Sequence, residues 1–103
     1  MPDRLEALKN LVALNPHQVF ARYGLAMAYA GRGEFEQALQ EYEAVLSHDP
    51  DYAVAYFQAG QALEKLGRLE EARQMYCRGI QVTTRLGQGH ARDQLQDALD
   101  LLG

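Results

Sequence analysis

Residues 17–50 read HQVFARYGLAMAYAGRGEFEQALQEYEAVLSHDP, and residues 51–84 read DYAVAYFQAGQALEKLGRLEEARQMYCRGIQVTT. Aligned without a gap, these two 34-residue stretches carry the same or a similar residue at spaced positions. The pairs are Gly33 and Gly67, Ala38 and Ala72, Tyr42 and Tyr76, and Leu46 and Ile80. A fixed period of this length is typical of repeat architectures, in which one helical or strand unit stacks on the next.

The same interval extends toward the N-terminus but not toward the C-terminus. Counting back 34 residues from Leu39, Tyr42, Val45, Leu46 and Pro50 leads to Leu5, Leu8, Leu11, Val12 and Pro16. Residues 3–16 are therefore interpreted as a half repeat, and 17–50 and 51–84 as two full repeats. Counting forward from Gly60 reaches Gln94, where a small residue is expected. We expect residues 90–102 to be a capping helix, and residues 1–103 to form a single domain.

Apolar residues recur at helical spacing within each period, and strand alternation is absent. The pattern predicts six helices, at about 3–14, 17–30, 35–47, 51–65, 69–85 and 90–102. Asn15-Pro16 and Asp49-Pro50 suggest a capping side chain and a first-turn proline at two helix starts. Thr84 stands where a closing proline is expected, so the fifth helix should continue toward Leu86. Short links make neighbours antiparallel, which predicts an all-α, right-handed solenoid of helix pairs.

Composition excludes several classes of protein. The 14 acidic and 10 basic residues give a net charge of −4, and no block of five like charges occurs. Such scattered basic residues argue against nucleic-acid binding, which needs clustered Lys and Arg. No segment is apolar enough for a membrane span, and the N-terminus lacks a signal-peptide pattern, so a cytoplasmic location is expected. The single cysteine, Cys77, has no partner for an internal disulfide.

No motif for catalysis, cofactor binding or metal binding is apparent. His17, His48 and His90 stand apart in the sequence, and no second cysteine accompanies Cys77. Glu70 and Glu71 are adjacent, so they do not share a helix face. The glycine pairs at 31–33 and 87–89 follow no strand and precede no Gly-Lys-Ser or Gly-Lys-Thr, so they are interpreted as turns. We therefore expect no enzyme, no cofactor and no metal site.

The repeat resembles the tetratricopeptide repeat, whose signature is W-x2-L-G-x2-Y, then A-x3-F, then P. In the first full repeat the matching positions are Arg22, Leu25, Ala26, Tyr29, Ala38, Tyr42 and Pro50. In the second they are Tyr56, Ala59, Gly60, Leu63, Ala72, Tyr76 and Thr84. The resemblance covers roughly residues 4–84, and it implies a curved array whose first helices line a concave groove for a partner peptide or helix.

The resemblance assigns the groove positions to Phe20, Tyr23, Met27, Val54, Phe57, Gln61, Glu64 and Lys65. Some members of the family grip an acidic C-terminal tail with Lys, Asn and Arg in this groove. The corresponding positions here are Tyr23, Met27 and Gln58, so an apolar or amphipathic partner segment suits the groove better. Phe20, Tyr23 and Phe57 are equally compatible with ordinary packing inside the protein.

Three functions follow from this reading. The first is a protein-interaction module that binds an apolar segment of another protein in the groove. The second is a subunit that self-associates through the same groove, because a short array exposes much of its ends. The third and weakest is an enzyme, which would need a cluster of titratable groups that the spacing does not show.

Overall fold

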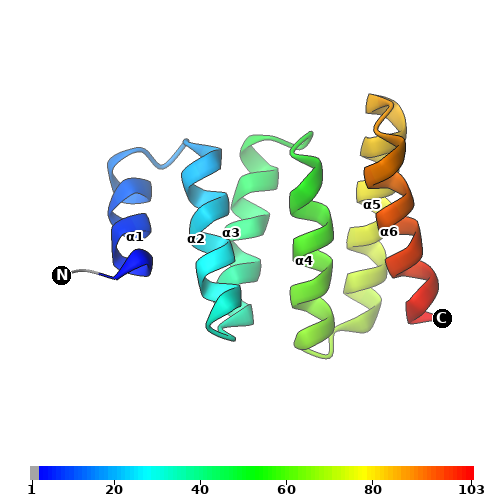
Figure 1. The fold of residues 1–103 in the computed structure, drawn as a ribbon, viewed down its shortest axis with the longest axis horizontal. Coiled ribbons are helices and arrows are strands. Elements are labelled where there is room, and N and C mark those ends of the chain that lie inside the picture. The colour runs from blue at the N-terminus through cyan, green and yellow to red at the C-terminus, as the bar shows by residue number, and fades with distance from the viewer. Residues whose placement is uncertain (1–2) are drawn as a thin grey trace.

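The computed structural model describes residues 3–103, and these residues are arranged as six helices joined by short turns (Figure 1). The helices are α1 (Arg4–Leu14), α2 (Val19–Gly31), α3 (Phe35–His48), α4 (Ala53–Lys65), α5 (Leu69–Leu86) and α6 (Gly89–Leu102). The all-α class and the six helices predicted from the sequence are confirmed, with bounds that differ by at most two residues. None of the described helices is long and apolar enough to cross a membrane.

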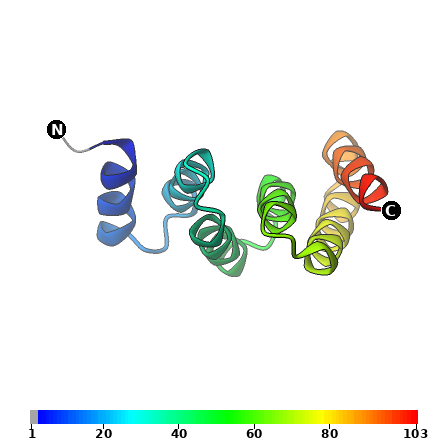
Figure 2. The same cartoon turned by 90° about the horizontal axis from the view of Figure 1, so that it is seen from below.

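Consecutive helices pack as antiparallel neighbours along the 43 Å length of the molecule. Seen along the helices, α2, α4 and α6 form one row, and α3 and α5 form a second row (Figure 2). We call α2 and α4 the first helices of their repeats, and α3 and α5 the second helices. By the 34-residue interval, α1 corresponds to a second helix. The main buried cluster extends from α2 to α6, and a smaller one, Leu5, Val12, Ala21 and Leu25, joins α1 to α2.

The prediction that Asn15 and Asp49 cap α2 and α4, with a proline in the first turn of each helix, is wrong. Asn15 and Asp49 end α1 and α3, and the N-caps of α2 and α4 make no side-chain hydrogen bond. In each turn, a backbone N–H bonds to the C=O three residues earlier, from Gln18 to Asn15 and from Tyr52 to Asp49, both at 3.1 Å. The proline therefore occupies the second position of a four-residue turn, where its fixed φ is favoured, and the helix begins after it.

In each of these turns the proline carbonyl oxygen accepts a hydrogen bond from a side chain of the helix that follows. The two donor side chains stand at equivalent positions, 34 residues apart. The Arg22 guanidinium donates a hydrogen bond to the carbonyl oxygen of Pro16 at 2.9 Å. The Tyr56 hydroxyl donates one to the carbonyl oxygen of Pro50 at 2.7 Å. Two chemically different side chains thus satisfy equivalent backbone acceptors 34 residues apart.

Gly60 of α4 and Tyr76 of α5 approach each other closely within their helix pair. A Cβ atom at Gly60 would lie 2.1 Å from Cε1 of the Tyr76 ring. The ring is rigid and fully buried, so it has no room to move aside. In the first full repeat the equivalent pair is Ala26 and Tyr42, both buried. A small residue opposite a tyrosine therefore sets the spacing of both helix pairs.

The equivalent tyrosines Tyr42 and Tyr76 differ in the hydrogen bonds of their hydroxyl groups. The Tyr76 hydroxyl donates a hydrogen bond to Glu64 and accepts one from Nε2 of Gln61 at 2.6 Å. The Tyr42 hydroxyl has no hydrogen-bond partner among the described residues. Burial raises the pKa of both phenols above the usual range, so both remain neutral at physiological pH.

The prediction that the fifth helix continues past Thr84 is confirmed. The helix α5 continues past Thr84 to Leu86 and ends at Gly87, whose φ of 72° is left-handed. The helix α6 then folds back on α5, and Leu95 is only 1% exposed. The polar side of α6 faces solvent, in agreement with the amphipathic pattern of its sequence.

We expect Gly60→Ala to lower the free energy of unfolding by roughly 1–2 kcal/mol. Overpacking a core costs about 1–3 kcal/mol, and a clash this close falls at the upper end of that range. Alanine recovers about 1 kcal/mol as the better helix former. Urea denaturation followed by circular dichroism measures the change. The matched control is Gly31→Ala, where a Cβ meets nothing within 4 Å. Equal stability of Gly60→Ala and wild type would contradict the close approach.

We expect Tyr76→Phe to lower the free energy of unfolding by about 1–3 kcal/mol, because it removes a hydrogen bond to a carboxylate. Tyr42→Phe serves as the matched control at the equivalent position. It removes a buried hydroxyl without a partner, so stability should be unchanged or higher. The same urea titration compares the two variants, and equal losses in both would contradict the hydrogen-bond assignment.

Candidate functional site

An apolar hollow of about 370 Å³ lies between α1 and α2, and we call it the N-terminal hollow. It is lined by Arg4, Leu8, Leu11, Gln18, Phe20, Ala21, Tyr23, Gly24 and Met27. Phe20 is 76% exposed and Met27 is 41% exposed, so two large apolar side chains stand at the surface beside it. Three of the predicted groove residues, Phe20, Tyr23 and Met27, therefore gather at one place.

A second hollow, of about 230 Å³, lies between α4 and α6, and we call it the C-terminal hollow. Val54 and Phe57 line it, together with Ala53 of α4 and Gln88, Ala91, Gln94 and Leu95 of the C-terminal segment. Val54 is exposed, whereas Phe57 is half-buried and packs against the main core. The predicted groove is thus divided between two hollows, one at α2 and one at α4.

The remaining predicted groove residues have different surroundings. Gln61 and Glu64 are half-buried, and their side chains bond to the Tyr76 hydroxyl and to each other. Lys65 is exposed at the end of α4. Gln61 and Glu64 line neither of the two hollows. Their hydrogen bonds already tie α4 to α5, so this part of the face is polar and occupied.

Tyr23 connects the N-terminal hollow to the core. Its ring centroid lies 5.9 Å from that of Tyr42 and 5.3 Å from that of Tyr52, in tilted arrangements favourable to aromatic pairs. Burial raises the pKa of Tyr23, with a smaller contribution from Tyr52. The wall of the hollow that Tyr23 forms is therefore held in place by α3 and by the turn before α4.

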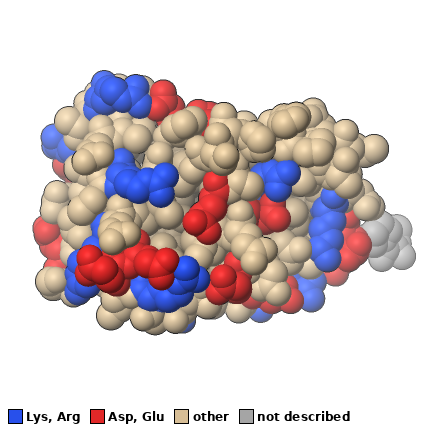
Figure 3. Space-filling model, turned by 180° about the vertical axis from the view of Figure 1, so that it is seen from behind, with Lys and Arg blue, Asp and Glu red and all other residues tan. Residues whose placement is uncertain are grey.

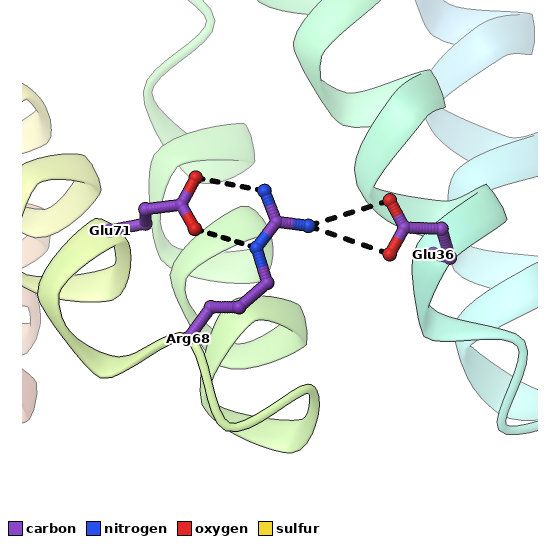
Figure 4. A network of polar contacts seen from close by, with 3 residues as sticks. All are labelled: Glu36, Arg68 and Glu71. Atoms are coloured by element: carbon purple, nitrogen blue, oxygen red, sulfur yellow. Dashed lines mark hydrogen bonds and ion pairs between the residues drawn. The ribbon is translucent and has the colours of Figure 1, made fainter.

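The side of the molecule seen from behind carries charged residues of both signs among residues of other kinds (Figure 3). Lys and Arg side chains alternate with Asp and Glu over the surface, without a large patch of one sign (Figure 3). Arg68 lies between Glu71 of its own repeat and Glu36 of the preceding one (Figure 4). Its bidentate contact with Glu71 has distances of 2.6 and 2.8 Å, and this contact lowers the pKa of the Glu71 carboxyl. The exposed contact between Arg68 and Glu36 links the two full repeats.

Two features of the structure were missed by sequence reasoning. His17 and His48, which stand apart in the sequence, form an edge-to-face pair with ring centroids 5.0 Å apart. No group of three potential metal ligands accompanies them in the described part of the chain. Leu8 and Leu11 of α1 were also not predicted to line the site. The signal was present, because the 34-residue interval places them at the positions of Tyr42 and Val45 of the following repeat.

Family models described as "Tetratricopeptide repeat" match residues 5–46 and 30–80. A TPR repeat-containing protein of Pseudomonas aeruginosa is 25% identical over 91 residues, which are 88% of this chain and 87% of that protein. A tetratricopeptide repeat domain protein from Salinibacter ruber, solved by NMR, is 32% identical, with a TM-score of 0.79. That alignment covers 85% of this chain and 89% of the other.

The fold also matches PcrH, solved in complex with the chaperone binding region of PopD, with a TM-score of 0.89. The match covers 95% of this chain and 74% of PcrH, at 19% identity. At this identity the likeness concerns the fold alone. The matched family models, the Salinibacter ruber structure and the six antiparallel helices together show that this chain belongs to the tetratricopeptide repeat family, whose domains are protein–protein interaction modules.

Proposed function

We propose that this chain binds an apolar or amphipathic segment of a partner protein on the side of α2 and α4 that bears the two hollows. The observation that carries the proposal is the N-terminal hollow, where exposed Phe20 and Met27 border an apolar depression. Large exposed apolar side chains grouped around a hollow are typical of protein interaction sites. PcrH, which has the same fold, holds a segment of another protein, and this supports the assignment.

The chemistry of the surface favours an apolar partner over a charged tail. Arg4 is the only charged residue that lines the N-terminal hollow, and the C-terminal hollow has no charged lining residue among those described. Of the three positions that correspond to the Lys, Asn and Arg of a carboxylate clamp, Tyr23 and Met27 carry neither a positive charge nor an amide, and Gln58 carries an amide but no charge. The flexible thioether of Met27 adapts to partners of different shape.

Self-association is the second candidate, because the same exposed Phe20 and Met27 are suitable for a contact between two copies. The proposal predicts a monomer in the absence of a partner. Sedimentation velocity over a concentration series separates the two candidates, since a dimer at micromolar concentration would favour self-association.

We expect the double variant Phe20→Asp/Val54→Asp to lose the partner that the wild-type chain captures from a lysate of its source organism. Both side chains are exposed, so the changes should leave the fold intact while placing carboxylates on the binding surface. Affinity capture read by mass spectrometry measures the loss, and circular dichroism checks the fold.

The matched control is Leu69→Asp/Leu101→Asp, which alters two exposed leucines on α5 and α6, away from both hollows. Leu69 is about as exposed as Val54, and Leu101 is more exposed than Phe20. Capture by the control but not by the double variant supports the proposal. Equal capture by both variants refutes the assigned surface.

A further inference from the structure

We infer that the N-terminal hollow receives an amphipathic α-helix of a partner protein, in the place that a first helix of the half repeat would occupy beside α1 and α2. The inference rests on the proposed function and deepens it. It gives the secondary structure, the position and the direction of the bound segment.

The exposure of α1 identifies which helix the hollow lacks. In the full repeats the second helix is covered by the first helix of its own repeat, as Tyr76 is by Gly60. Val45 of α3 is 0% exposed, whereas Leu11, its counterpart in α1, is 49% exposed. Leu8, the counterpart of the fully buried Tyr42, is only half-buried. The apolar side of α1 thus has the residue positions that a first helix covers in the full repeats, and α2 covers only part of it.

The walls of the hollow have the spacing that a helix requires. Leu8 and Leu11 lie one turn apart on α1, and Phe20, Tyr23 and Met27 follow one another by single turns on α2. The two walls meet at the base, where the Leu8 side chain lies 3.3 Å from the Cβ position of Gly24. Two helical rows that diverge from such a contact form a groove into which the side-chain ridge of a third helix packs.

The direction of the bound helix follows from the alternation of the array. A helix paired with α1 runs antiparallel to it, so its C-terminal end lies beside Arg4, the first residue of α1. Arg4 is exposed and forms no ion pair with any described residue. A guanidinium stabilises the negative end of a helix dipole and an acidic residue in its last turn. We therefore assign to the partner helix an apolar side and an acidic C-terminal turn.

A second copy of this chain does not suit this place. The free side of α6 would have to face Leu8 and Leu11 if a second copy docked end to end. That side exposes Leu101 but also Asp93, Asp97 and Asp100, so an end-to-end contact would place three carboxylates against leucines. A helix from another protein is the occupant whose chemistry matches the hollow.

Two synthetic peptides test the inference with the full chain. Each is an alanine-based helix of about 18 residues with leucines along one side, and they differ in whether a glutamate lies in the last or the first turn. We expect the peptide with the C-terminal glutamate to bind about two- to fivefold more tightly by fluorescence anisotropy, and Arg4→Gln to abolish this difference. Leu11→Glu should weaken both peptides by at least about tenfold, because it buries a carboxylate. Leu69→Glu, similarly exposed on α5, should change neither affinity.

The outcomes separate this inference from the proposed function. Binding that survives Leu11→Glu unchanged, or no binding of either peptide, overturns the inference. If the inference fails but Phe20→Asp/Val54→Asp still loses the natural partner, the proposed function stands alone. If this double variant keeps the natural partner, both the proposed function and the inference are refuted. Sedimentation of the wild-type chain as a dimer that Leu11→Glu dissociates would make a second copy the occupant and overturn the inference.

Discussion

The packing of a buried tyrosine against a small residue on the facing helix determines the rest of the structure. Gly60 and Ala26 allow Tyr76 and Tyr42 to lie at the centre of their helix pairs, where both rings are fully buried. Because this contact fixes how closely two helices approach, it also fixes where the third helix can pack. One pair cannot cover its own apolar surface, so each depends on the next helix along the chain.

The two ends of the array meet this requirement differently. At the C-terminal end, α6 packs on α5 with Leu95 buried and presents acidic residues to solvent. At the N-terminal end, α1 has the sequence positions of a second helix but no first helix beside it among the described residues. Four exposed large apolar residues lie on α1 and α2 at this end, namely Leu11, Leu14, Phe20 and Met27. Local features of the repeat thus account for the position of the candidate binding site.

The fold was largely predictable, because the sequence shows both a 34-residue interval, which indicates a repeat, and the helical spacing of apolar residues, which indicates helices. The turns at Pro16 and Pro50 were assigned too close to the helices, since Pro suits a first helical turn and the second position of a four-residue turn equally well. The division of the groove was not predictable. Gln61 and Glu64 share the helical face of Phe57, and only the position of Tyr76 on α5 shows that they form a polar bridge. Contacts between residues distant in sequence, such as His17 with His48, likewise depend on exact helix rotation.

Amide hydrogen exchange of the captured complex, compared with the free chain, tests most directly which side of the molecule binds. Occupation of the N-terminal hollow should slow exchange in Arg4–Leu14 and Val19–Gly31, where the covering helix restricts local opening. Exchange in Phe35–His48 and Leu69–Leu86 should change less. Slower exchange confined to those last two helices would place the partner on the side of α3 and α5 and contradict the account.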